Sequence, residues 1–177
     1  MSAILLAGFG GQGILFAGKQ LAAMGMDNGK QVSWLPSYGP EMRGGTCNCS
    51  VNIDDEPIGS PLVLTPDILI AFNKPSYQKF ITSVVSGGMV FADSTLIDCA
   101  SERSDITEIR IPATALASQN GIDKLANVIM LGRLIKATGL FDYDEFKAHL
   151  IASSPKSKPQ LAELNAKALE IGYNYAE

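Results

Sequence analysis

The chain has 177 residues, of which 46% are hydrophobic and 18% charged, and its net charge at pH 7 is −4. This length predicts one domain, residues 1–177, that buries about 70% of the surface of its unfolded chain. The acidic balance argues against a nucleic-acid binder, and so few charges suggest that part of the surface faces another protein. No uncharged apolar stretch approaches about 18 residues and a strand is expected from residue 3, so we expect no membrane insertion, no signal peptide and a cytoplasmic location.

The N-terminal segment predicts a strand at 3–7, a glycine turn at 8–13 and a helix that extends to about Met26. A second expected strand at 31–35 completes a βαβ unit, which implies a parallel sheet and a right-handed crossover. A helix that begins at such a turn points backbone N–H groups outward and carries roughly +0.5 of an elementary charge at that end. The turn therefore suits a phosphate or a carboxylate.

The glycine spacing matches G-x-G-x-x-G, the pattern of dinucleotide-binding turns. However, the second strand ends in Trp34-Leu35-Pro36 and lacks the acid that would hold a ribose, which disfavours a nicotinamide cofactor. Lys19 follows Gly18 as in a P-loop, but Gln20 stands where Ser or Thr would hold magnesium, which excludes an NTPase. Two hypotheses remain: a turn that receives an anion, with Lys19 further along the helix, and a tight packing turn without a ligand.

Residues 36–45 contain two prolines and three glycines, so we expect a long irregular loop there. Loops of this length usually have a function. From residue 46 the sequence alternates between apolar and polar residues, which predicts a half-buried strand with Cys47 and Cys49 on its apolar face. We interpret both cysteines as small core side chains.

The remainder of the chain predicts an α/β fold. Continuous apolar runs at 67–72 and 88–93 indicate buried strands, with a helix at 75–85 between them. Their polar ends, Asn73 and Asp93, would lie at the sheet edge where open α/β sheets bind ligands. A further strand is expected at 107–111. The last expected elements are helices, at about 124–138, 143–151 and 159–173. The first of these is apolar around most of its circumference, so it is either buried or covered by a partner. The predicted fold is Rossmann-like, with a mostly parallel sheet, helices on both faces and C-terminal helices.

Few side chains suit catalysis or metal binding. Cys47 and Cys49 form C-x-C rather than the C-x-x-C of zinc and redox sites, and three cysteines are too few for a four-thiolate cluster. The single histidine, His149, lies in an expected surface helix, where we interpret it as solvated. We therefore assign this chain no catalytic residue and no metal site.

Residues 8–15 (GFGGQGIL) and 34–46 (WLPSYGPEMRGGT) resemble the gamma subunit of 2-oxoacid:ferredoxin (acceptor) oxidoreductases, most of all that of the 2-oxoglutarate enzyme. Segments 48–51, 55–61 and 66–73 extend the resemblance, which covers the first hundred residues strongly and the rest in outline. Pyruvate, branched-chain and indolepyruvate relatives remain alternatives, as does a purely structural subunit.

The resemblance implies a complex that decarboxylates a 2-oxoacid on thiamine diphosphate, passes electrons to ferredoxin or a similar acceptor and transfers the acyl group to coenzyme A. Thiamine diphosphate, magnesium and iron–sulfur clusters would belong to alpha, beta and delta-type partners, and the isolated chain would be inactive.

The resemblance also implies two groups of site residues. In one-chain pyruvate enzymes the matching turn contributes to coenzyme A binding, which places that role on Gly8, Gly10, Gly11, Gln12, Gly13 and Lys19. A substrate or interface loop near the catalytic subunits would comprise Ser37, Tyr38, Glu41, Arg43, Gly44, Gly45 and Thr46. Within it, Arg43 would bind a carboxylate or phosphate, or instead pair with Glu41.

Overall fold

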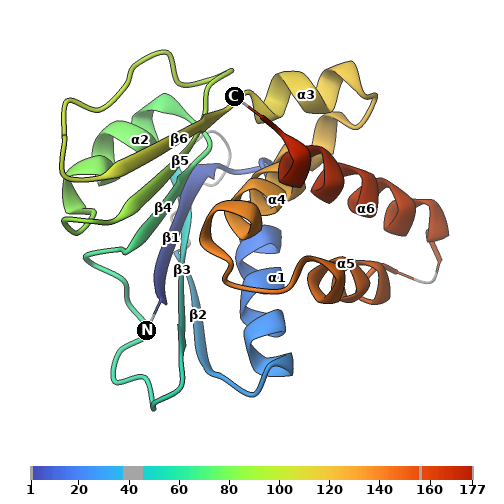
Figure 1. Cartoon of the computed structure of the whole chain (residues 1–177), viewed down its shortest axis with the longest axis horizontal. Coiled ribbons are helices and arrows are strands. Elements are labelled where there is room, and N and C mark those ends of the chain that lie inside the picture. Colours follow the sequence, from blue (N-terminus) through green and yellow to red (C-terminus); the bar gives the residue numbers. More distant parts are fainter. Residues whose placement is uncertain (1, 38–45, 156, 177) are drawn as a thin grey trace.

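The computed structural model describes residues 2–37, 46–155 and 157–176. A six-stranded sheet in the order β2-β3-β1-β4-β5-β6 runs through it, with helices packed on both faces (Figure 1). The strands are β1 (Ser2–Phe9), β2 (Gln31–Ser37), β3 (Thr46–Asp54), β4 (Ile68–Ala71), β5 (Met89–Asp93) and β6 (Thr107–Ile111). The helices are α1 (Ile14–Asp27), α2 (Lys74–Phe80), α3 (Ala113–Gln119), α4 (Ala126–Thr138), α5 (Tyr143–Ala152) and α6 (Pro159–Asn174), and the 3-10 turns are η1 (Ile81–Ser83) and η2 (Asp123–Leu125).

The sheet is mostly parallel, as expected, but one strand runs the other way. β1, β4, β5 and β6 pair in parallel, whereas β3 pairs antiparallel with both β1 and β2. β1 and β2 run in the same direction, as the expected βαβ unit implies, but β3 lies between them. β2 also extends through Pro36, which we expected to begin a loop; an edge strand tolerates a proline because it needs ladder hydrogen bonds on one side only.

β3 lies in the interior of the sheet because it pairs with a strand on each edge, and both of its faces are buried. The prediction of a half-buried strand fails on its polar face, where Ser50 and Asn52 are enclosed by the chain at 60–63. Ser50 Oγ accepts a hydrogen bond from the N–H of Val63 at 3.1 Å, and Asn52 Nδ2 donates to Ser33 Oγ at 3.0 Å. These bonds compensate the burial of polar groups that the alternating pattern had placed in solvent.

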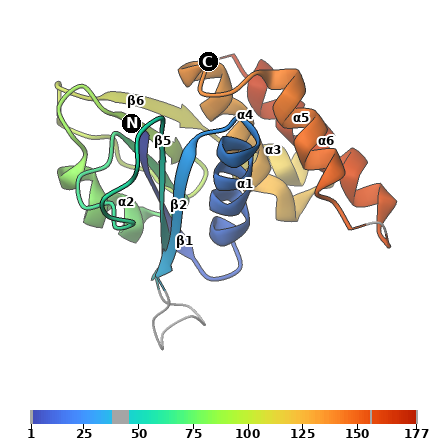
Figure 2. The same cartoon turned by 90° about the horizontal axis from the view of Figure 1, so that it is seen from below.

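Alternate residues of the central strands point into two separate cores. Leu6, Ile70 and Phe91 face α1 and α4, whereas Leu5, Leu69 and Val90 belong to a second cluster with Tyr77 of α2. Figures 1 and 2 show α2 on one side of the sheet and α1, α4, α5 and α6 on the other. The expectation of helices on both faces is confirmed.

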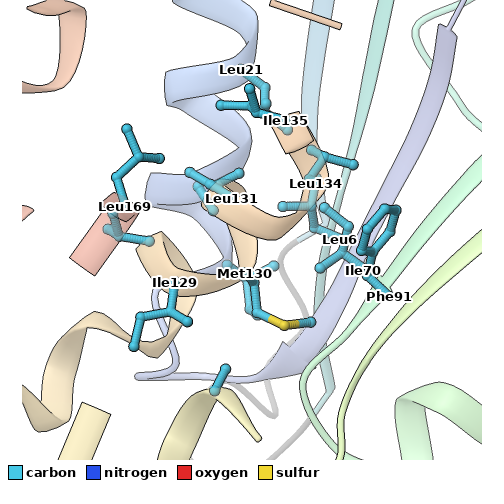
Figure 3. Packing of buried hydrophobic residues seen from close by; sticks show 14 of the residues in the cluster. Leu6, Leu21, Ile70, Phe91, Ile129, Met130, Leu131, Leu134, Ile135 and Leu169 are labelled. Carbon is cyan, nitrogen blue, oxygen red and sulfur yellow. The ribbon is translucent and has the colours of Figure 1, made fainter. Parts of the chain in front are cut away.

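Helix α4 is buried between the sheet and α6, as its apolar circumference predicted (Figure 3). It approaches α6 backbone to backbone: a Cβ added at Gly172 would lie 1.8 Å from the carbonyl oxygen of Ile129, and one at Gly132 would lie 2.2 Å from that of Leu169. The chain's own α6 therefore covers this apolar helix. No described helix is both long and apolar enough to cross a membrane.

Candidate functional site

The glycine turn joins the carboxyl end of β1 to the start of α1. Gly11 and Gly13 have φ angles of +100° and +75°, in the left-handed region that glycine adopts without strain. Gly13 is the N-cap of α1, and among the described residues no side chain caps this helix and no acid lies in its first turn. The first N–H groups of α1 are thus left for an external acceptor, and the positive end of the helix favours an anion there.

The side chain of Gln12 fixes the shape of this turn from inside. Its Oε1 accepts hydrogen bonds from the N–H of Phe9 at 2.6 Å and from Asn73 Nδ2 at 3.3 Å, while its Nε2 donates to the carbonyl of Phe72 at 2.9 Å. The polar atoms of this side chain are therefore engaged within the chain. Asn73, which we expected at the ligand edge, also caps α2 by accepting from the N–H of Ser76 at 2.8 Å.

The predicted glycines divide into a packing group and an exposed group. Gly8 is buried in β1, where an added Cβ would lie 2.6 Å from Gln12 Oε1 and 2.8 Å from the Ile14 side chain. Gly10 and Gly11 are exposed, and nothing lies within 4 Å of a Cβ added at Gly11. The structure therefore leaves Gly10 and Gly11 accessible to a ligand and gives Gly8 a packing role.

Two clefts adjoin the turn on the side of the C-terminal helices. The first has a volume of about 200 Å³ and is lined by Gly11, Gln12, Phe72, Leu96, Thr114, Asp123, Lys124 and Ala126. The second has a volume of about 220 Å³ and is lined by Gly13, Phe16, Lys124, Leu125, Asn127, Ser153, Ser154, Pro155, Leu161 and Asn165. The first cleft lies beyond the carboxyl ends of parallel strands, where open α/β sheets bind ligands.

Asp93 does not reach this first cleft as a free carboxylate. It is fully buried at the end of β5, where Oδ2 accepts hydrogen bonds from the N–H and the hydroxyl of Thr114 and Oδ1 accepts from the N–H of Thr95. Among the described residues, Asp93 therefore holds the start of α3 in place beside the cleft.

Lys124, and not Lys19, is the cation at the clefts. Lys19 is exposed on α1 and lines neither cleft, whereas Lys124 lines both. Lys124 precedes α4, which is held to the turn because Asn127 Nδ2 donates to the carbonyl of Gly13 at 3.1 Å. Sequence reasoning missed Lys124 because the two segments are far apart in the chain and Asn127 lies in an otherwise ordinary apolar pattern.

The predicted interface loop ends beside the glycine turn. Ser37 is the exposed last residue of β2, and Thr46 begins β3 directly opposite Phe9, the last residue of β1. Tyr38, Glu41, Arg43, Gly44 and Gly45 lie outside the described residues. The structure therefore brings the end of one predicted motif next to the start of the other.

The cysteines and the histidine have structural surroundings. Cys47 and Cys49 are buried, as predicted, and burial raises the pKa of the Cys49 thiol to about 12. His149 is not simply solvated as expected: its ring is mostly buried, and Nδ1 lies 2.9 Å from Asp27 Oδ2 at the end of α1. Within the described ranges, no cluster of three His, Cys, Asp or Glu side chains is placed to bind a metal.

Comparison with known proteins identifies the family to which this chain is similar. Residues 3–175 match the sequence model of the pyruvate ferredoxin/flavodoxin oxidoreductase family. Ketoisovalerate oxidoreductase subunit VorA of Methanothermobacter marburgensis is 40% identical over 174 residues, which cover 98% of this chain and 36% of VorA. The 2-oxoglutarate synthase subunit KorC of Methanocaldococcus jannaschii is 36% identical over 177 residues, which cover 98% of this chain and 93% of KorC. The chain thus spans about a third of VorA and nearly all of KorC.

Solved structures show the same fold. The keto/oxoacid ferredoxin oxidoreductase gamma subunit from Geobacter sulfurreducens has a TM-score of 0.82 and 27% identity, and the match covers 98% of this chain and 96% of that one. The 2-oxoglutarate:ferredoxin oxidoreductase from Magnetococcus marinus, with 2-oxoglutarate, coenzyme A and succinyl-CoA bound, has a TM-score of 0.86 at 22% identity and covers 97% and 30%. The chain therefore belongs to the pyruvate ferredoxin/flavodoxin oxidoreductase family, and the predicted resemblance to the gamma subunits of 2-oxoacid oxidoreductases is confirmed.

Proposed function

We propose that this chain is the gamma subunit of a multi-subunit 2-oxoacid:ferredoxin oxidoreductase and that its glycine turn forms part of the coenzyme A site. The observation that carries the proposal is the uncapped start of α1, which follows two glycines with positive φ, the first of which, Gly11, is exposed with open space around it. The solved Magnetococcus marinus enzyme, which shares the fold, holds coenzyme A.

The geometry of the turn fits the chemistry of this ligand. Coenzyme A contains a pyrophosphate, and a helix N-terminus binds phosphate oxygens through N–H groups and through the helix dipole. Gly10 and Gly11 have no side chains that would keep a phosphate from the backbone, and Gln12 holds the turn in place through Phe9, Phe72 and Asn73. These hydrogen bonds hold the turn in one shape, and a turn with a fixed shape loses less conformational entropy when it binds a ligand.

The other steps of the reaction fall to partner subunits in this proposal. Thiamine diphosphate, magnesium and iron–sulfur clusters would be held by alpha, beta and delta-type subunits, through which electrons would reach ferredoxin or a similar acceptor. The described residues of this chain would bind and orient the thiol substrate and contribute surface to the complex. We expect the isolated chain to have no oxidoreductase activity and to gain it on assembly.

For the 2-oxoacid we propose 2-oxoglutarate. The motifs at 8–15 and 34–46 resemble the 2-oxoglutarate enzyme most, and KorC matches this chain over 93% of its own length as a separate subunit. VorA, at 40% identity, makes a branched-chain 2-oxoacid the alternative. Steady-state assays of the assembled enzyme with 2-oxoglutarate, pyruvate and ketoisovalerate discriminate between them, and a higher kcat/KM for ketoisovalerate would reverse this assignment.

The coenzyme A role is tested with a matched pair of variants at Gly11 in the assembled enzyme. In both Gly11→Asp and Gly11→Asn the new residue must adopt the same left-handed backbone conformation. The two side chains have nearly the same size, but only Asp adds a negative charge. We expect Gly11→Asp to raise the KM for coenzyme A at least tenfold above that of Gly11→Asn, because a carboxylate repels the pyrophosphate. The KM for the 2-oxoacid serves as the internal control.

A turn without a ligand is the competing hypothesis. It is favoured by the hydrogen bonds of the Gln12 side chain to other residues of this chain, which give the turn a structural role as well. Equal KM values for coenzyme A in the two Gly11 variants and the unchanged enzyme would support this hypothesis and leave the chain with an assembly role only.

A further inference from the structure

The two clefts beside the glycine turn share one charged side chain. Lys124 lines both, and it is the one cationic side chain among the described residues that line either cleft. It is exposed, and the described residues provide no ion pair for it. A lysine placed at the junction of two clefts without an internal partner is available to a ligand.

The backbone around Lys124 is held rigidly against the turn. Lys124 lies in η2, where the N–H of Leu125 donates to the carbonyl of Ile122 at 2.8 Å, and α4 begins directly afterwards. Asn127, in the first turn of α4, is 3% exposed and donates from Nδ2 to Gly13, the N-cap of α1. The position of Lys124 is therefore fixed relative to the N–H groups of α1.

The polar contacts at this junction are incomplete among the described residues. Asn127 Oδ1, in the amide group that lies against Gly13, is buried without a hydrogen-bond partner. A buried acceptor of this kind usually requires a hydrogen-bond donor from water or from a ligand. It indicates a polar site at this junction that is independent of the helix dipole, although a phosphate oxygen, itself an acceptor, would not be its partner.

We propose that Lys124 provides the cationic contact to the phosphate groups of the ligand that the glycine turn receives, and so determines affinity for a phosphorylated thiol substrate. This inference rests on the proposed coenzyme A role of the turn. It replaces Lys19, which the motif comparison had favoured, because Lys19 lines neither cleft. Asp123 lines the first cleft beside Lys124 and opposes an anion there, so the phosphate contact belongs at the junction with the second cleft.

The test uses the assembled enzyme with Lys124→Ala, Lys124→Arg and, as a matched control, Lys79→Ala on α2. Lys79 is also exposed but lies across the sheet from both clefts. We expect Lys124→Ala to raise the KM for coenzyme A about tenfold, the effect of losing one charge-assisted hydrogen bond, with kcat and the KM for the 2-oxoacid unchanged. Lys124→Arg should recover most of the affinity, and Lys79→Ala should not change it.

A competition assay identifies the part of the ligand concerned. ADP presents a diphosphate without the thiol arm, and its inhibition constant against coenzyme A should rise in Lys124→Ala by the same factor as the KM. Asp123→Asn should lower both constants about twofold, because it removes a negative charge from the first cleft. A charge effect of this kind should weaken as the salt concentration rises.

The outcomes separate this inference from the proposal on which it rests. If Lys124→Ala leaves both constants within twofold while Gly11→Asp raises the KM for coenzyme A, the turn binds the ligand without Lys124 and this inference is wrong. A tenfold effect of Lys19→Ala with none of Lys124→Ala would also overturn it, in favour of the sequence-based assignment. If neither Lys124→Ala nor Gly11→Asp has an effect, both proposals fail.

Discussion

Glycines have opposite roles at the turn before α1 and at the crossing of α4 with α6. At the turn, Gly11 and Gly13 are needed for their positive φ angles, and the space around Gly11 is open. At the crossing, Gly132 and Gly172 lie in regular helix, where an added Cβ would lie within 2.2 Å of the opposite backbone. The first region uses glycine to expose its backbone and the second to bury it, so only the first can receive a ligand.

The largest effect should come from filling the helix crossing. A Cβ at Gly172 would lie 1.8 Å from the carbonyl oxygen of Ile129, and backbone on both sides cannot yield as a flexible side chain would. We expect Gly172→Ala to destabilise the protein by about 3 kcal/mol, at the upper end for overpacking. Urea or thermal unfolding of the purified subunit or complex measures this change. An equal stability in Gly172→Ala would show that the helices separate easily and that the crossing is not a rigid contact.

A smaller effect is expected at the turn, because its constraint is conformational. Gly11→Ala should cost about 1 kcal/mol, since an alanine must adopt a left-handed φ but meets no atom within 4 Å. Gly139→Ala at the end of α4, with a φ of +61° and equally open space, is the matched control and should cost about the same. A loss at Gly11 near that of Gly172→Ala would contradict the open surroundings of Gly11 and the purely conformational cost expected there.

At pH 8 the smallest effect is that of Cys49, which lies on β3 against α1. Its pKa is raised by burial from the ordinary 9.0 to about 12, so the folded state keeps the proton that the unfolded state loses. Stability from this thiol is complete well below pH 9 and is lost as the pH rises through 9 toward 12, at roughly 1 kcal/mol per pH unit. Unfolding measured from pH 8 to 10 in the unchanged protein and in Cys49→Ala tests this, and parallel pH profiles would contradict it.

The sequence predicted most strands and helices because each carries its own hydrophobic pattern. β1, β4, β5 and the buried α4 all come from apolar runs with clear ends. The short helix α3 was missed because it lacks a side-chain cap and buries only two alanines, Ala113 and Ala117, so no pattern of large apolar residues marks it. Local pattern is thus sufficient where an element buries large side chains.

Placement of strands and site residues required contacts that local pattern does not contain. The position of β3 between β1 and β2 is given by backbone pairing with both strands, and its buried Ser50 and Asn52 form hydrogen bonds with other segments. The turn at 8–13 was located correctly, yet the internal role of Gln12 and the approach of Lys124 both arise from distant residues. Sequence therefore predicted the glycine turn but not the lysine that lines the clefts beside it.

The pairing of Thr46 with Phe9 has a consequence for assembly. Phe9 faces the start of β3 on one side, and its own N–H donates to Gln12 inside the glycine turn. A protein that binds at Thr46 would therefore act on the strand end from which the glycine turn begins. We expect subunit docking and thiol-substrate affinity to be thermodynamically linked, so that each strengthens or weakens the other by the same factor.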